Sequence, residues 1–165
     1  MTDYFSLLNI LPAFDIDFAA LETAYFQQQR LWHPDRFTGK PVAEKQAAMQ
    51  RSVDINQGYN TLKNPLTRAQ YLLQLSGIAV GTDKDSIKPA QPLLIEVMEW
   101  REQVEEGTEL DKLDSLLKTI QSKTIDNLSA SYNNNALEMM AQEALKLSYV
   151  IKTLDEIRQR KLKLK

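Results

Sequence analysis

The sequence LWHPDRF, residues 31–37, decides the fold, because it lies between two long helical patterns. Pro34 disfavours helical backbone at the residue before it, so the first pattern ends at about Trp32. Apolar residues at helical spacing begin near Asp17 on one side and resume at Val42 on the other. We therefore expect two antiparallel helices that are joined by the loop 33–41.

Each of these two helices carries one apolar stripe with which it can pack against the other. Either Asp15 or Asp17 can cap the first helix, and the second helix extends to about Leu62. The predicted contact residues are Phe18, Leu21, Tyr25 and Leu31 on the first helix and Ala48, Ile55, Tyr59 and Leu62 on the second.

Short helices are predicted on both sides of this hairpin. Thr2 can cap a first helix that runs through Leu8. Asn64 followed by Pro65 combines an N-cap with a proline in the first turn, and this helix continues through Leu75. The prediction is an N-terminal domain over residues 1–76, made of a helical hairpin and short helices.

A linker and a second helical domain are predicted after it. Residues 77–91 contain two glycines, one proline and several polar residues, which is typical of a linker. Pro92 then opens a helix that Gly107 ends. Thr108 and Asp111 resemble a capping box for the next helix.

Two further stretches have apolar residues at alternating spacings of three and four, which is the seam of a helical bundle. The turn between them is Asn133-Asn134-Asn135. We expect an antiparallel three-helix bundle over residues 92–165, and therefore an all-α chain. The seams are Leu110, Leu113, Leu117, Ile120 and Thr124, then Leu137, Met140, Ala144, Leu147, Ile151 and Leu154.

Composition limits what this chain of 165 residues can do. The formal net charge is −2, so the chain lacks the excess of positive charge that is typical of general nucleic-acid binding. With no cysteine and one histidine, the sequence excludes cysteine-based zinc sites, cysteine ligation of iron–sulfur clusters and multi-histidine metal sites. No run approaches the roughly 20 apolar residues of a membrane span. We expect no cofactor, no metal, no nucleic-acid partner and no membrane partner.

Catalysis finds little support in the sequence. Glycine-rich phosphate loops, nucleophile elbows and zinc-binding helix motifs are all missing from it. Glu102 and Glu106 could hold a metal as a pair, but an acidic helix face is usually just solvated. The five bases within Arg158–Lys165 could contact a membrane or nucleic acid, yet at a helix end they more often complement the helix dipole. We expect a binding protein and not an enzyme.

The triplet His33-Pro34-Asp35 is the most specific signal in the chain. A proline and an aspartate often follow a helix, but this triplet should arise by chance in about one chain of this length in a hundred. The triplet, its two flanking helices and the pattern of Ile55, Asn56 and Tyr59 resemble the J domain of DnaJ-type co-chaperones.

A narrower resemblance is to the HscB family, the J-type co-chaperones of iron–sulfur cluster assembly. It rests on Asp3-Tyr4-Phe5, on NPLTRAQYLL at residues 64–73 and, more weakly, on Leu93 to Val104. The resemblance implies that the chain stimulates the ATPase of a dedicated DnaK-type chaperone such as HscA, and that it delivers the scaffold protein IscU. An open alternative is a J-domain protein that serves a different client, and another is a helical interaction module whose triplet is incidental.

The resemblance assigns chaperone binding to the loop. Pro34 would stiffen the loop before docking, and Asp35 would accept hydrogen bonds from a partner arginine. Basic residues are sparse on the preceding helix, which favours a dedicated partner and weak salt dependence. The predicted chaperone-binding residues are His33, Pro34, Asp35, Arg30 and Arg36.

Helix 92–106 has a second apolar face besides the one needed for bundle packing. At 100° per residue, Leu94, Ile95 and Met98 point away from the stripe that contains Val97 and Trp100. The resemblance implies that this face binds IscU, through Leu94, Ile95, Met98, Glu99, Glu102 and Tyr149. From residues 1–5, which have neither a signal-peptide nor a transit-peptide pattern, we expect a bacterial cytoplasmic protein and not a mature mitochondrial form.

Overall fold

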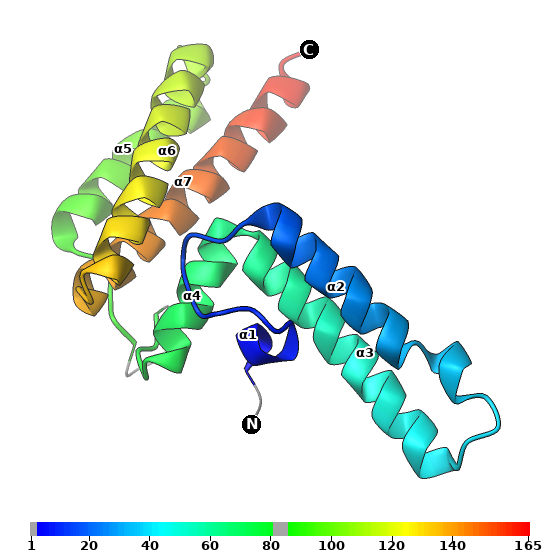
Figure 1. The fold of residues 1–165 in the computed structure, drawn as a ribbon. Helices are drawn as coiled ribbons and strands as arrows, with labels where there is room; N and C mark the ends of the chain where they lie inside the picture. The colour runs from blue at the N-terminus through cyan, green and yellow to red at the C-terminus, as the bar shows by residue number, and fades with distance from the viewer. Residues whose placement is uncertain (1–2, 81–85) are drawn as a thin grey trace. The chain divides into compact units, whose positions relative to one another are not determined.

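A computed structural model describes residues 3–80 and 86–165 of the chain. The regular elements in these ranges are all helices, which confirms the predicted fold class (Figure 1). The chain forms two compact units, Met1–Leu72 and Leu73–Lys165. The domain bounds 1–76, 77–91 and 92–165 stay predictions, and part of the predicted linker lies outside the described residues.

The first unit is built on a helical hairpin. Helix α2 (Phe18–Trp32) and helix α3 (Val42–Lys63) lie side by side, joined by a loop that contains the 3₁₀ turn η1 (Pro34–Phe37) (Figure 1). Asp17 caps α2, since its carboxylate accepts hydrogen bonds from the N–H groups of Ala19 and Ala20. These bounds agree with the pattern in the sequence.

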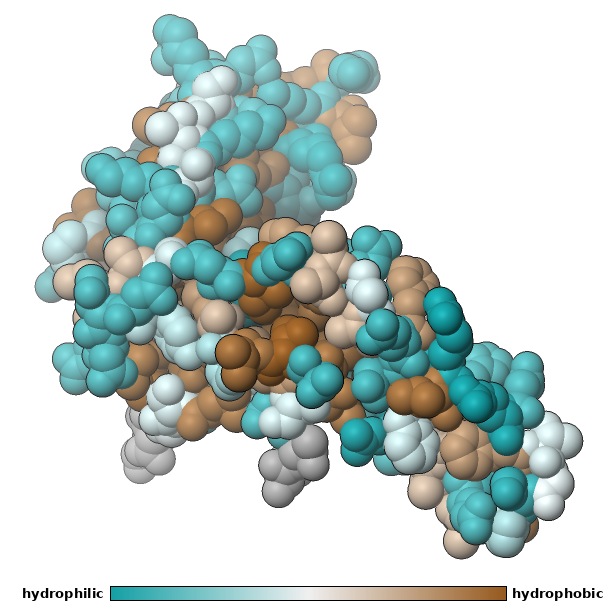
Figure 2. Space-filling view, viewed as in Figure 1, coloured by the Kyte–Doolittle hydropathy of each residue, from teal (hydrophilic) through white to brown (hydrophobic). Residues whose placement is uncertain are grey.

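The apolar contact between α2 and α3 is narrower than predicted. Leu21, Ala48, Ile55 and Leu62 are buried as expected, but the Phe18 and Leu31 side chains are 54% and 52% exposed. The prediction was wrong for these two residues, because they lie in the first and last turns of α2, where the hairpin ends. Figure 2 shows apolar and polar side chains interspersed along this hairpin.

Four polar residues, Tyr25 and Gln29 on α2 and Ser52 and Asn56 on α3, add hydrogen bonds to this contact. The Tyr25 hydroxyl donates to Asn56 Oδ1 at 2.5 Å, and Ser52 Oγ donates to Gln29 Oε1 at 2.8 Å. Gln29 Nε2 donates in turn to the Ser52 carbonyl at 3.2 Å. We call these four residues the polar ladder. It compensates for the few apolar contacts in this half of the hairpin.

Helix α1 (Tyr4–Leu7) packs against α3. Its N-cap is Asp3, which accepts a hydrogen bond from the Ser6 N–H; the predicted cap, Thr2, lies outside the described residues. The Tyr4 ring rests on Gly58 and stacks on Tyr71, with centroids 4.7 Å apart. The Tyr4 N–H donates to the Tyr71 hydroxyl at 2.8 Å, and burial raises the pKa of Tyr71.

Helix α4 (Pro65–Leu75) begins at Asn64, whose side chain accepts a hydrogen bond from the Leu66 N–H, as predicted. Its Arg68 is buried, and its guanidinium donates to the Leu62 carbonyl at 2.7 Å. The same group lies 4.7 Å from the centroid of the buried Phe14 ring. Burial lowers the pKa of Arg68, while the nearby Asp15 opposes that shift.

The second unit is a three-helix bundle of α5 (Gln91–Glu106), α6 (Leu110–Asn133) and α7 (Leu137–Lys163) (Figure 1). Helix α7 packs on both of the others, whereas α5 and α6 touch each other little. Its buried face is therefore broader than one seam. Beyond Leu147 the seam prediction was only partly right: Leu154 packs against the core cluster, but Val150 and Ile157 are buried in place of Ile151, which is half-buried.

The turn between α5 and α6 also differs from the prediction. Gly107 ends α5 with a φ of 72°, as expected for a C-terminal glycine. Helix α6, however, begins after Glu109, which has a φ of 49° and makes no capping hydrogen bond. Gln103 donates to the Thr108 and Glu109 carbonyls, which holds Thr108 outside the helix. The predicted capping box is therefore wrong.

A single glutamine fastens the segment before α5 to α7. Gln142 Nε2 donates to the Lys88 carbonyl at 2.8 Å, and its Oε1 accepts from the Ala90 N–H at 2.9 Å. The side-chain amide thus pairs with the backbone as a neighbouring strand would. This contact fixes where α5 begins relative to α7.

Candidate functional site

The loop after α2 presents the His-Pro-Asp triplet on a short turn. His33 has extended backbone, with φ −61° and ψ 134°, and Pro34 occupies the first position of η1. His33 Nδ1 accepts a hydrogen bond from the Asp35 N–H at 3.2 Å. This bond requires a lone pair on Nδ1, so the ring proton of neutral His33 lies on Nε2.

The acidic group of the triplet is open to a partner. The side chain of Asp35 is 92% exposed and that of His33 is 56% exposed. His33 Nδ1 lies 3.6 Å from Asp35 Oδ2, too far for a hydrogen bond. The carboxylate therefore keeps most of its capacity to accept charge-assisted hydrogen bonds.

Two arginines border the triplet, and the structure brings them together. Arg36 Nη1 donates to the Arg30 carbonyl at 3.1 Å, which folds the loop back on α2. Arg30, His33 and Arg36 line a hollow of about 400 Å³ together with Phe26 and Gln29. Pro34 and Asp35 adjoin this hollow in sequence but are not among its lining residues.

Phe26 and Gln29 were missed by the sequence reasoning. Phe26 is 51% exposed, although it is a large apolar residue. It lies four residues before Arg30, which places both on one face of α2, and His33 follows directly after the end of that helix. This spacing could have indicated Phe26 as a site residue, but a phenylalanine at helical spacing also fits the apolar stripe of the hairpin.

The second candidate surface is the outer face of α5. Val97, Trp100 and Val104 are buried in the bundle core, as predicted. Ile95 and Met98 lie on the opposite side and are 54% and 69% exposed. We call the exposed group Leu94, Ile95, Met98, Glu99 and Glu102 the α5 outer face.

Leu94 and Tyr149 lie nearer to the core than the rest of the predicted set. Leu94 is 38% exposed, as its position beside the buried stripe implies. Tyr149 on α7 is half-buried and packs against the core cluster that contains Val97 and Trp100. Tyr149 therefore belongs partly to the bundle core, whereas Ile95 and Met98 are largely exposed to solvent.

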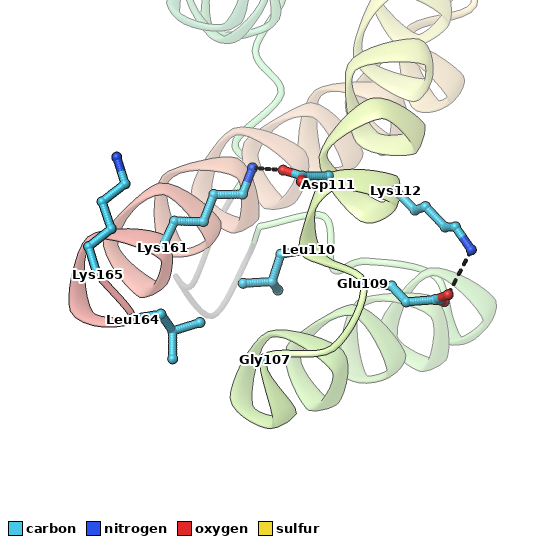
Figure 3. Close-up of a pocket in the computed structure, with 8 residues that line it drawn as sticks. All are labelled: Gly107, Glu109, Leu110, Asp111, Lys112, Lys161, Leu164 and Lys165. Carbon is cyan, nitrogen blue, oxygen red and sulfur yellow. Dashed lines mark hydrogen bonds and ion pairs between the residues drawn. The ribbon is translucent and has the colours of Figure 1, made fainter.

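Another hollow, of about 630 Å³, lies at the turn between α5 and α6 (Figure 3). Four of its charged residues are paired within the unit: Lys161 with Asp111 at 2.5 Å, and Lys112 with Glu109 at 2.7 Å. No group of His, Asp or Glu that could hold a metal ion occurs among residues 3–80 and 86–165. In the same ranges, no helix is long and apolar enough to cross a membrane.

Comparison with known proteins identifies the chain's relatives. Residues 90–158 match the family model described as the HSCB C-terminal oligomerisation domain. The chain is 35% identical over 166 residues to a co-chaperone protein HscB homolog of Shewanella frigidimarina, covering 94% of both chains. It is 40% identical over 132 residues to the homolog of Aromatoleum aromaticum, covering 76% of this chain and 74% of that one.

Solved structures show the same relationship. Human co-chaperone protein HscB superimposes with a TM-score of 0.88 at 32% identity, covering 98% of this chain and 83% of that one. Chaperone HscB from Vibrio cholerae superimposes with a TM-score of 0.85 at 27% identity, covering 99% and 100%. With its exposed His-Pro-Asp loop on a helical hairpin and its three-helix bundle, the chain belongs to the HscB family of co-chaperones.

Proposed function

We propose that this chain stimulates the ATPase of a dedicated DnaK-type chaperone of the HscA kind, and that it delivers the iron–sulfur scaffold protein IscU to that chaperone. The observation that carries the first part is the exposed His33-Pro34-Asp35 loop, with its outward carboxylate. Asp35 would accept hydrogen bonds from a chaperone arginine, while Pro34 limits the conformations that the loop loses on docking.

The chain acts here as an activator and performs no chemistry of its own. Its relatives are named co-chaperones, which supports this part of the proposal. Hydrolysis would take place in the chaperone, and the iron–sulfur cluster would stay on the scaffold as cargo. The proposed site of action is the bacterial cytoplasm.

Scaffold binding is proposed for the α5 outer face, together with Tyr149. A patch with apolar residues at its centre and acidic residues at its rim is the usual anatomy of a specific, transient interface. Ile95 and Met98 supply the apolar centre, and Glu99 and Glu102 supply the rim. Binding one partner on each unit would raise the local concentration of the client at the chaperone. An alternative client on the same face is the second candidate, since the apolar residues there do not by themselves identify IscU.

Single-turnover ATP hydrolysis by the HscA-type chaperone tests this proposal, with the chain added alone or together with the scaffold. We expect the chain to accelerate hydrolysis and the scaffold to add a further, synergistic increase. In His33→Gln, stimulation should fall to the unstimulated rate, because the turn loses the ring that caps Asp35. Circular dichroism checks that the variant is folded.

The outcomes separate the two parts of the proposal. If the scaffold adds no further increase in ATP hydrolysis, the loop assignment stands and the alternative client is favoured. Full stimulation by a folded His33→Gln variant would contradict the loop assignment.

A further inference from the structure

The two aromatic residues at the ends of the His33–Asp35 turn contact each other. Trp32 precedes the triplet and Phe37 closes η1, and their rings stack with centroids 6.0 Å apart and planes at 10°. Both residues are half-buried, whereas the three residues of the triplet are exposed. The stacked rings therefore hold the ends of a turn whose own side chains contribute little burial.

Arg51 on α3 brings a positive charge to this pair. The centre of its guanidinium lies 5.3 Å from the centroid of the Trp32 ring, within the range of a cation–π contact. Its Nε is buried and has no hydrogen-bond partner among the described residues. Arg51 is half-buried, and the face of Trp32 lies beside its partly buried guanidinium, where it can compensate for the missing hydrogen bond.

The remaining hydrogen bonds of the turn are local, although η1 also packs against α3. Besides the bond from the Asp35 N–H to His33, the Arg36 N–H donates to the His33 carbonyl at 3.0 Å. The guanidinium of Arg36 reaches only as far as the Arg30 carbonyl on α2. These bonds shape the turn and attach it to α2, whereas Arg51 attaches its Trp32 end to α3.

We propose that Arg51 is a positioning residue, which holds the His33–Asp35 turn in its binding conformation through its contact with Trp32. The inference rests on the proposed function, because the conformation matters only if the turn docks on a chaperone. Arg51 itself need not touch the partner. Its loss should raise the ordering cost of docking and leave the docking groups His33 and Asp35 unchanged.

The test compares Arg51→Gln and Arg51→Lys with a matched control on the same helix. Lys63 lies 5.5 Å from the centroid of the Tyr59 ring, so Lys63→Gln removes a similar cation–π contact at the other end of α3. Two readouts are taken on the full chain. The first is amide exchange of Asp35 and Arg36, with the indole resonance of Trp32, in the absence of any partner. The second is chaperone ATPase stimulation against co-chaperone concentration.

In Arg51→Gln we expect the Trp32 indole resonance to shift and exchange at Asp35 and Arg36 to rise several-fold. The half-maximal co-chaperone concentration should rise about three- to tenfold, while the maximal stimulated rate stays within about twofold of the wild type. Arg51→Lys should restore part of both effects, because it keeps the charge. Lys63→Gln should change neither the turn nor its docking.

Three results would overturn the inference. One is unchanged exchange at Asp35 and Arg36 in Arg51→Gln. Another is a lower maximal rate at an unchanged half-maximal concentration, which would place the effect of Arg51 in the stimulation of hydrolysis and not in docking. The third is faster exchange throughout α2 and α3, which would make Arg51 a general stability residue. If the wild type fails to stimulate the chaperone, the proposed function fails, and the exchange arm still decides whether Arg51 holds the turn.

Discussion

Gly58 permits the close approach of α1 to α3. It lies inside a helix with ordinary helical backbone, where glycine costs about 1 kcal/mol relative to alanine. A Cβ at this position would lie 3.1 Å from Tyr4 Cδ1 and 3.2 Å from Tyr4 Cβ. Because Tyr4 Cβ is fixed to the backbone, α1 itself would have to move.

We therefore expect Gly58→Ala to destabilise the first unit in spite of its better helix propensity. Overpacking typically costs about 1–3 kcal/mol, so the net loss in the free energy of unfolding should be about 1 kcal/mol. Urea unfolding measures the free energy of unfolding, and amide exchange in α1 and α3 locates the change. Gly39→Ala is not a suitable control because its φ is 83°; Asn60→Ala, at an exposed position of α3, is suitable. Stabilisation by Gly58→Ala would show that α1 moves freely.

Residues differ in how far the sequence could assign them. The turn at His33, Pro34 and Asp35 could be predicted because its signal is local: a proline ends a helix and the next residues form a turn. The importance of Gly58 and Arg51 could not be predicted, since each depends on a ring from another helix, Tyr4 for the one and Trp32 for the other. Neither residue interrupts the helical pattern of α3.

Among the helices, the pairing of α6 with α7 includes one ion pair between Asp111 and Lys161. The hydrogen bond from Lys161 lowers the pKa of Asp111, and the same bond raises the pKa of Lys161 (Figure 3). Because the folded pKa of Asp111 lies below the ordinary value of 3.8, the contribution of the pair is present above that value. It is lost as the pH falls through the lowered pKa.

We expect Asp111→Asn to lower the thermal midpoint of the chain slightly near neutral pH, since an exposed pair contributes little. The difference from the wild type should shrink as the pH falls below 3.8 and vanish well below it. Thermal unfolding of both proteins across the acid range measures this. Glu109→Gln is the control, because its partner Lys112 is only three residues away. A difference that persists in strong acid would assign the effect to packing.

Elements could be predicted better than the contacts between them. Helix α2 begins after Asp17 and ends before Pro34, while Asn64 marks the end of α3 and the start of α4. Each of these residues acts on its own neighbours in the sequence. The start of α6 was mispredicted, because Gln103 in α5 holds the carbonyl of Thr108. The later seam of α7 was mispredicted for a similar reason: a helix with two partners buries more than one stripe.

Taken as a whole, the chain divides its two candidate surfaces between its two units: the loop lies in residues 1–72 and the α5 outer face in 73–165. The assignments of these surfaces to partners stay proposals. Of the residues predicted for scaffold binding, Ile95, Met98, Glu99 and Glu102 are exposed, whereas Leu94 lies nearer to the bundle core and Tyr149 packs against it.

Loss of the α5 outer face should therefore affect one partner alone. We expect Leu94→Ala with Met98→Ala to weaken scaffold binding tenfold or more, as for central residues of an interface. Chaperone stimulation without the scaffold should stay as in the wild type. Calorimetry measures the first effect and the ATPase assay the second. Leu116→Ala removes a leucine on α6 that is 52% exposed and serves as the control. Wild-type scaffold affinity in the double variant would exclude this face.

The polar ladder between α2 and α3 has a mechanical consequence. Apolar surfaces tolerate sliding, because one methyl group can replace another, whereas hydrogen bonds are directional. A slip of one helical turn, about 5.4 Å, would break the Tyr25–Asn56 and Gln29–Ser52 bonds together. The polar ladder therefore fixes the register of α2 against α3. A force applied to the loop would therefore move α2 and α3 together, without a change in their register.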